Sequence, residues 1–424
     1  MAPIEDLLSF ISASPSPYHA VAETGRRLAG AGFSELQLTE PWSPGGGLHW
    51  VQRGGALVAW ADVTGSDEPF RVVGAHTDSP NLRIKPRPDT GTAGWRQLGV
   101  EVYGGALANS WLDRDLGLSG RVAVRTDAGI SERLFRVDRP LLRIPQLAIH
   151  LDREISSQGL KLNAQQHLTP VWGVGPVTDG AFVTLLAEQL GVEAEAVLGW
   201  DVMVHDLTPP VRLGIHEELV AAPRIDNQLS CWAAIDALIA TTESAAPPPV
   251  VPVVCLFDHE EVGSTSSTGA DGSLLANVLE RIDLAAGGGR ERLLRRLAGS
   301  HAASADGAHA THPNYPERHD PEHRVAIDGG PVIKINANQR YATDANTAAL
   351  LIDACGRAGV PHQVFVSRND QPCGSTIGPL TSARLGMATA DIGVAQLSMH
   401  SARELCGVQD PPRLAAALHA FLSG

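Results

Sequence analysis

The sequence predicts an α/β fold, with a mixed central sheet flanked by helices and an inserted β-rich domain. Strand-like apolar runs alternate with amphipathic helical segments over residues 1–88 and again over 214–424. Between them, residues 89–213 show short alternating runs separated by turn residues, a pattern typical of β-rich domains. We therefore predict a discontinuous α/β domain (1–88 and 214–424) that is interrupted by a β-rich insertion (89–213).

The N-terminal part of the α/β domain is predicted to contain helical material and two strands. Residues 4–28 predict a helix that is interrupted by a Ser- and Pro-rich segment. The apolar runs 56–63 and 70–76 predict strands, and the second run ends at His76, shortly before Asp78. Because open α/β sheets place their functional groups at the carboxyl ends of strands, both residues are candidates for a functional site.

The C-terminal part returns to alternating helices and strands. An amphipathic helix is predicted to follow Asp226, and the apolar run 250–257 predicts a buried strand. Helical material over 273–299 is interrupted by a Gly-rich segment. The remaining predicted elements are strands in PVIKINAN, HQVFVSRND and ATADIGV, a helix over 341–359 and a closing helix after Pro412.

Composition and charge exclude several classes of function. The 424-residue chain has 43% hydrophobic and 19% charged residues, which is ordinary for a globular protein, and its net charge of −14 argues against nucleic-acid binding. No apolar run is long enough to span a bilayer, and the acidic N-terminus does not resemble a signal peptide. The five widely spaced cysteines contain no CxxC motif and favour reduced thiols. We therefore expect a cytoplasmic protein that binds neither nucleic acid nor membranes.

Two adjacent glutamates, Glu260 and Glu261, follow the buried strand-like run 250–257. Ionised carboxylates rarely stand at the end of a buried run unless something pairs with them, and a metal ion is the usual partner. Two neighbouring carboxylates also permit one to hold a metal while the other moves a proton. Further candidate ligands stand at widely spaced positions: His76, Asp78, Asp226, Asp306 and His400.

Metal-assisted hydrolysis would use such a set of residues. Two divalent ions about 3.5–4 Å apart can activate a water molecule and polarise an amide carbonyl, and a bridging carboxylate offsets their repulsion. Asp226 is a candidate bridge, although Asp is also a favoured helix N-cap residue. The glutamate pair could instead be a solvated pair. His309 and His312 could alternatively form the basis of a structural metal site.

Together these segments resemble the aspartyl aminopeptidase family, including its bacterial members. These enzymes are dizinc metallo-aminopeptidases in a larger clan of dinuclear hydrolases. The resemblance extends from SPSPYHAV near the N-terminus to LSMHSARE near the C-terminus. The stretches between them that carry it include GAHTDSPNLRIKP, YGGALANSWLDRDLGLSGRV, APRIDNQ, FDHEEVGSTSSTGA, SADGAHATHPNY, GGPVIKINANQRYATD and RNDQPCGSTIGP.

The resemblance implies a complete set of metal ligands. Asp226 would bridge two zinc ions, His76 and Asp306 would complete one, and Glu261 and His400 would complete the other. Such His and carboxylate ligands also suit Mn²⁺ or Co²⁺ as substitutes.

The family also implies roles for the residues that surround these ligands. Glu260 would be the general base that carries a proton from the water to the leaving amine. Asp78 would orient His76. The Asp226–Asn227 peptide bond is expected to be cis.

The family removes N-terminal Asp or Glu, so a cationic side chain should meet the substrate carboxylate. Lys334 is the candidate, with Tyr341 as a hydrogen-bond donor nearby. Otherwise, Lys334 would merely end an edge strand. His150 resembles the family histidine that reaches into the active site of a partner subunit and stabilises the oxyanion. The alternative for His150 is a core histidine on an apolar strand.

We therefore expect a metal-dependent aminopeptidase whose α/β domain is catalytic and whose insertion mediates dimerisation. By resemblance, its substrates are peptides and its assembly is a homo-oligomer, a dodecamer. Two alternatives remain open. One is another dinuclear hydrolase of the clan, such as a deacylase or carboxypeptidase, and the other is a non-catalytic assembly or cargo protein on the same fold.

Overall fold

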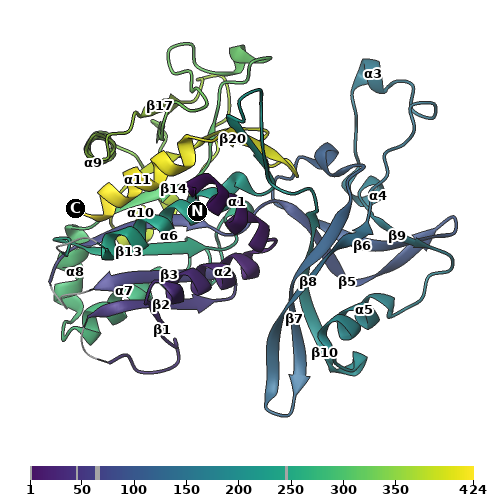
Figure 1. Cartoon of the computed structure of the whole chain (residues 1–424), viewed down its shortest axis with the longest axis horizontal. Coiled ribbons are helices and arrows are strands. Elements are labelled where there is room, and N and C mark those ends of the chain that lie inside the picture. The colour runs from purple at the N-terminus through teal and green to yellow at the C-terminus, as the bar shows by residue number, and fades with distance from the viewer. Residues whose placement is uncertain (1, 44–45, 63–66, 244–246) are drawn as a thin grey trace. The chain divides into compact units, whose positions relative to one another are not determined.

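The computed structural model describes residues 2–43, 46–62, 67–243 and 247–424, which form two compact units (Figure 1). The second unit starts earlier than expected, at Ser79 and not at residue 89, because strand β5 (Asn81–Thr92) pairs with β6 (Trp95–Tyr103) and β10 (Val197–Asp206) in the sheet of that unit. The first unit contains Met1–Asp78, Pro210–Met399 and Glu404–Gly424, and the second contains Ser79–Pro209 and His400–Arg403.

The first unit is built on a nine-stranded mixed sheet, so the predicted α/β class is confirmed. Strand β13 lies between β3, to which it is antiparallel, and β4, to which it is parallel. Strands β4, β14 and β18 continue the parallel part. In sheet order the strands are β1 (Ser34–Glu35), β2 (Gly47–Arg53), β3 (Ala56–Asp62), β13 (Val251–Phe257), β4 (Phe70–His76), β14 (His301–Ala305), β18 (Ala388–Gly393), β16 (Val332–Ile335) and β17 (Gln363–Val366).

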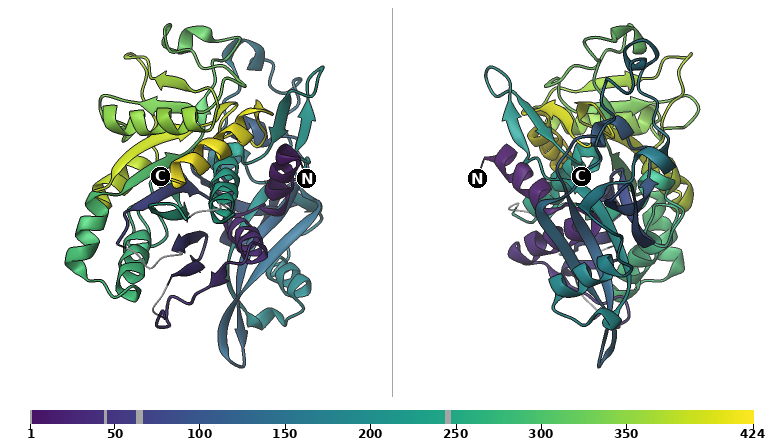
Figure 2. Two further views of the ribbon diagram at one scale, coloured as in Figure 1. Left: turned by 60° about the vertical axis from the view of Figure 1, so that its left-hand side comes forward. Right: turned by 90° about the vertical axis from the view of Figure 1, so that its right-hand side faces the viewer.

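Helices cover both faces of this sheet, which explains why its strands read as continuous apolar runs. Alternate residues of β13 enter opposite cores: Val254 and Leu256 pack on one side, and Val253 and Cys255 on the other. The first core contains α1 (Pro3–Ala13), α2 (Pro17–Gly30), α6 (Ile225–Thr242), α9 (Ala345–Arg357) and α11 (Asp410–Leu422) (Figures 1 and 2). The second core contains α7 (Leu274–Ala285), α8 (Arg290–Ala298) and α10 (Ile377–Leu385).

Most predicted helices are confirmed, with one informative difference at α9. The helix predicted over 341–359 begins only at Ala345, because Asp344 and Thr347 form a capping box that starts it there. Tyr341 therefore lies in the preceding turn, outside the helix. The Ser- and Pro-rich interruption separates α1 from α2 as predicted, and the side chain of Ser16 caps α2.

A small third sheet also belongs to the first unit. It combines two strands within residues 211–222 with three short strands within residues 308–407. Its strands, in order, are β11 (Val211–Leu213), β12 (Leu219–Ala222), β20 (Glu404–Gly407), β19 (Ala395–Leu397) and β15 (Ala308–His309).

The second unit is β-rich, as predicted, and its sheet is antiparallel throughout. The long hairpin formed by β7 and β8 extends from this sheet (Figure 2). Phe182 and Leu186 of α5 pack into the hydrophobic core of the unit. In sheet order the strands are β8 (Gly129–Leu142), β7 (Leu116–Thr126), β10 (Val197–Asp206), β5, β6 (Trp95–Tyr103) and β9 (Val171–Val174), and the helices are α3 (Ile155–Gln158), α4 (Ala164–His167) and α5 (Ala181–Leu190).

Two further expectations concern membranes and thiols. In the described parts of the chain, no helix is both long and apolar enough to cross a bilayer. All five cysteines are free thiols, and Cys373 is the one that is not buried.

Candidate metal centre

Three neighbouring strands bring acidic and imidazole side chains to one edge of the central sheet. Strand β4 ends at His76, β14 is followed by Asp306, and β13 is followed by the short 3₁₀ turn that carries Glu260 and Glu261. These strands are adjacent and parallel, in the order β13-β4-β14. Because the carboxyl ends of adjacent parallel strands coincide, side chains that are far apart in the sequence converge here.

His76 lies at the centre of this cluster and is fully buried. Its Nε2 atom is 3.4 Å from Asp226 Oδ1, 3.4 Å from Asp306 Oδ1 and 3.9 Å from Glu260 Oε2. Its Nδ1 atom is 3.0 Å from the carbonyl oxygen of Asp78 and 3.3 Å from Asp78 Oδ1. Nδ1–H can therefore donate to Asp78, which leaves Nε2 facing the carboxylates as a lone-pair donor for a metal ion.

The donor atoms of the cluster are close enough to share a cation. In the groups His76, Asp226 and Asp306 and His76, Glu260 and Glu261, one donor atom from each residue lies within 4.8 Å of the others. One imidazole and several carboxylates form a set that suits Zn²⁺, and also Mn²⁺ or Co²⁺. The residues present therefore fit a divalent metal site.

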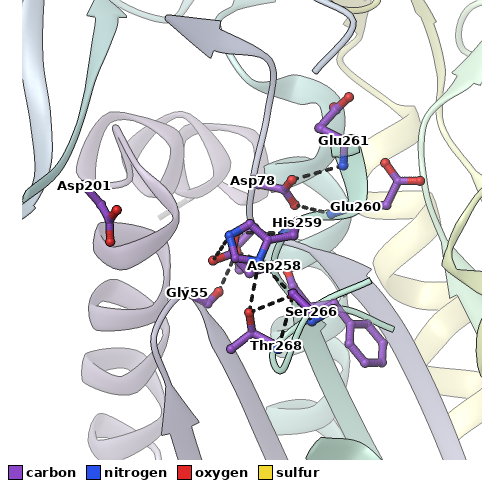
Figure 3. Close-up of polar contacts among 12 residues, drawn as sticks. Gly55, Asp78, Asp201, Asp258, His259, Glu260, Glu261, Ser266 and Thr268 are labelled. Carbon is purple, nitrogen blue, oxygen red and sulfur yellow. Dashed lines mark hydrogen bonds and ion pairs between the residues drawn. The ribbon is translucent and has the colours of Figure 1, made fainter. Parts of the chain in front are cut away.

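Asp78 has a second structural role that the sequence did not indicate. Its Oδ1 accepts the N–H of Glu260, and its Oδ2 accepts the N–H of Glu261, each at 3.1 Å (Figure 3). The same buried carboxylate thus holds both glutamates beside His76. No local signal could have revealed this, because Asp78 and Glu260 are 182 positions apart.

The turn that carries Asp226 is held by side chains from distant segments. The N–H of Asp226 donates to Glu404 Oε2 at 2.9 Å, and Asn227 Nδ2 donates to the carbonyl oxygen of Ala305 at 2.8 Å. The Asp226–Asn227 peptide bond is cis, as the resemblance implied. Asp226 and Asn227 have non-helical backbone angles at the start of α6, and the Asp226 carboxylate faces His76, which favours the metal-ligand interpretation over the N-cap alternative. Glu404 was not a sequence candidate.

The cluster concentrates negative charge in a buried place. Burial, reinforced by Asp306 and Asp226 although opposed by His76, raises the pKa of Glu260 to about 8. Burial, with Asp226 as the next largest cause, also raises the pKa of Glu261. Burial acts on Asp306 in the same direction, but Lys334 and His76 outweigh it and hold the pKa of Asp306 below its usual value. So many close carboxylates are stable as anions only when cations offset them.

Lys334 and Tyr341 are brought together beside this cluster. The Lys334 side chain is only 2% exposed, and its Nζ donates to the carbonyl oxygen of Gly307 at 3.0 Å and lies 3.5 Å from Asp306 Oδ2. Its ammonium group is 5.1 Å from the centroid of the Tyr341 ring. The edge-strand alternative for Lys334 is wrong, because β16 lies between β18 and β17.

A cavity of about 280 Å³ adjoins Tyr341 in the first unit. Gly307, whose carbonyl oxygen accepts from Lys334, packs against Gln396 and Met399, two residues that line this cavity. Among the described residues that line it, none carries a carboxylate. The basic and aromatic lining residues are His309, His312, Arg318, His319, Tyr341, Phe365 and Arg368.

The other sequence candidates lie apart from this cluster or in the second unit. Where the chain is described, His309 and His312 belong to no group of three close metal-binding side chains, so the structural-metal alternative is not supported. His400 belongs to the second unit, where its Nδ1 is 3.1 Å from the carbonyl oxygen of Gly105. His150 lies in an exposed turn of the same unit, so the core-histidine alternative is wrong.

Comparisons with known proteins agree with this site. The family model described as "Aminopeptidase I zinc metalloprotease (M18)" matches residues 10–422. A "Probable M18 family aminopeptidase 2" of Streptomyces coelicolor is 56% identical over 421 residues, which are 99% of this chain and 97% of the relative.

Solved structures show the same fold. The cryo-EM structure of the Ape4 and Nbr1 complex contains a chain that is 36% identical, with a TM-score of 0.94, and the match covers 99% of this chain and 85% of that one. The mApe1 dodecamer of S. cerevisiae contains a chain that is 28% identical, with a TM-score of 0.85, and the match covers 99% of this chain and 95% of that one.

Proposed function

Because this chain belongs to the M18 family of zinc metallo-aminopeptidases, we propose that it releases N-terminal residues from peptides, with a preference for Asp and Glu. The observation that carries the proposal is the buried convergence of His76, Asp226 and Asp306 with two glutamates at the ends of parallel strands. A deacylase or carboxypeptidase is less well supported, since the matched family consists of aminopeptidases.

We assign two zinc ions to the site. Asp226 would be the bridging ligand, His76 and Asp306 would complete one ion, and Glu261 and His400 would complete the other. The 3.4 Å approaches of Asp226 and Asp306 to His76 Nε2 support the first of these ligand sets. The assignment of His400 rests on its position in LSMHSARE, the motif shared with the aspartyl aminopeptidases.

Glu260 is the proton carrier in this mechanism. The zinc pair, when bound, supplies a Lewis acid that polarises the scissile carbonyl and acidifies a water molecule. Glu260 would take a proton from the attacking water and pass it to the leaving amine. The hydrogen bond from the Glu260 N–H to Asp78 supports this role, because it holds Glu260 beside the ligands without engaging its carboxylate.

A residue from a second copy of the chain is proposed to complete the site. His150, in an exposed turn, would donate a hydrogen bond to the developing oxyanion of a neighbouring subunit. This role needs a homo-oligomer, and we propose a dodecamer, the assembly named for the related mApe1.

The preference for acidic residues is supported by the charges around the cavity. Its lining includes Arg318 and Arg368, and no carboxylate among the described residues. Lys334 Nζ is 5.1 Å from the ring centroid of Tyr341, a lining residue; in this proposal the ammonium group would contact a substrate carboxylate, and the Tyr341 hydroxyl would donate a hydrogen bond to that carboxylate.

A panel of aminoacyl p-nitroanilides tests the reaction class and the preference together. We expect the zinc-loaded protein to cleave the Asp and Glu substrates fastest, then Leu, and to leave N-acetylated substrates intact. Removing zinc with a chelator should abolish cleavage, and adding zinc back should restore it. Equal cleavage of N-acetylated substrates would reject an aminopeptidase.

Lys334→Ala should change the side-chain preference. Losing a charge-assisted contact of about 1.5–3 kcal/mol should lower kcat/KM for the Asp substrate by roughly 10–150-fold. The Leu substrate should lose less than about threefold, because it makes no such contact. Zinc content is measured in parallel, since Lys334 also contacts Asp306.

The matched control for this variant is Lys85→Ala, which removes a lysine of the second unit. An equal loss on both substrates would show that Lys334 acts through Asp306 and does not recognise the substrate side chain.

A further inference from the structure

Asp391 is a buried carboxylate that takes no part in the metal cluster. It lies on β18, its exposure is 0%, and in the sheet it faces Lys334 of β16. A buried ionised carboxylate is costly unless several donors and a nearby cation compensate it. Burial raises the pKa of Asp391, and the nearby Lys334 is the largest influence that opposes this rise.

Two separate segments supply the hydrogen-bond partners of Asp391 that matter here. Asp391 Oδ2 accepts the N–H of Ala342 at 2.6 Å, and Oδ1 accepts the hydroxyl of Thr376. The N–H of Asp391 also donates to Thr343 Oγ1 at 2.8 Å. One side chain and its own backbone thus tie the turn before α9 to the start of α10.

The contact with α10 is tight. A Cβ built on Gly378 would lie 2.5 Å from Asp391 Oδ2, so only glycine lets the helix approach the carboxylate this closely. Thr376 caps this helix by accepting the N–H of Gly378. The separation between the turn and the helix is therefore set by the Asp391 carboxylate.

Both tied segments lead directly into the wall of the 280 Å³ cavity. Tyr341, next to Ala342, lines it from one segment, and Cys373 and Gly374, just before Thr376, line it from the other. Asp391 itself is not among the lining residues. It is placed to set the spacing of two walls without touching what the cavity holds.

We propose that Asp391 is a positioning residue of the substrate side-chain cavity, holding the Tyr341 wall and the Cys373–Gly374 wall at the separation that binds the N-terminal residue of a peptide. The inference rests on the proposed function, because it takes this cavity to be the substrate subsite. A positioning role differs from a general role in folding in its consequence. Loosening the two walls should weaken substrate binding more than it slows the chemical step.

Asp391→Asn provides the first test. The amide keeps the shape of the side chain but removes its charge and one acceptor oxygen, so one of the two charge-assisted contacts, to the Ala342 N–H or to the Thr376 hydroxyl, is weakened. For the Asp p-nitroanilide we expect KM to rise about tenfold, in line with the loss of one charge-assisted hydrogen bond, while kcat changes less than about threefold. Zinc content per chain should stay unchanged.

Thr376 supplies a matched pair of variants that keeps the test valid if Asp391→Asn does not fold. Thr376→Val is isosteric but cannot donate to Asp391, and should raise KM about fivefold or more. Thr376→Ser keeps the hydroxyl and should restore a near wild-type KM.

Three outcomes would count against the proposal, and they are distinguishable. An unchanged KM in folded Asp391→Asn, or in Thr376→Val, would overturn the positioning role alone. A parallel fall in zinc content and kcat in Asp391→Asn would show that Asp391 acts through the metal cluster, and this result would also overturn the positioning role. A wild-type protein that cleaves no member of the panel would instead reject the proposed function on which the inference rests.

Discussion

Glu260→Gln is expected to bind the full complement of zinc and to lose about 10²–10⁴-fold in kcat. The amide is nearly isosteric with the carboxylate, and the hydrogen bond between the residue 260 N–H and Asp78 is made by the backbone, so the turn should keep its geometry. An amide cannot take a proton from water at neutral pH, so the proton transfer is lost. Kinetics on the Asp p-nitroanilide and metal analysis of the same sample check this result.

The adjacent glutamate is the matched control. Glu261→Gln removes a proposed ligand and should lower zinc affinity, with activity recovering in part as the zinc concentration is raised. Full activity in Glu260→Gln would refute the proton-carrier role. Zinc loss in Glu260→Gln together with zinc retention in Glu261→Gln would mean that the two roles are exchanged.

Asp226→Asn is expected to abolish activity and to reduce zinc to less than one ion per chain. The proposed bridge offsets the repulsion between two doubly charged ions about 3.5–4 Å apart, and a neutral amide cannot do so. Zinc binding stabilises the native state of the wild-type protein by mass action, so added zinc should raise its Tm. In Asp226→Asn that rise should be largely lost.

Asp236→Asn is the control for this variant, because it makes the same chemical change at an exposed position of the same helix, α6. It should bind zinc and respond to added zinc as the wild type does. If Asp226→Asn still bound two zinc ions per chain, Asp226 could not be the bridging ligand.

Much of the first unit could be predicted because its signals are local. The apolar run that became β13 and the strand that ends at His76 are each readable within a few residues, since a strand repeats every two residues and a helix every 3.6. The start of α9 was harder to predict, because the capping box of Asp344 and Thr347 begins the helix at Ala345 and leaves Tyr341 in the preceding turn. The domain boundary was missed because β5 follows Asp78 almost directly and pairs with strands of the other sheet.

The site was predictable only as a set of residue types at strand ends. The adjacent glutamates indicated metal chemistry, and the motifs shared with a known family assigned partners to them. Those motifs could not show that Lys334 is buried against Asp306 or that His150 lies in an exposed turn. Exposure depends on which segments cover a residue, and the covering segments are distant in the sequence.

The sequence by itself therefore determined the fold class and the family, and it supplied the candidate set of chemically active side chains. Tertiary structure alone decided which side chains hold these segments in place. Asp78 accepts the N–H groups of both glutamates, Glu404 accepts the N–H of Asp226, and Asp391 accepts the N–H of Ala342 next to the cavity. The physical reason is the strand order β13-β4-β14, which places segments side by side that are far apart along the chain. Periodicity specifies each strand, but only the assembled sheet brings their ends together.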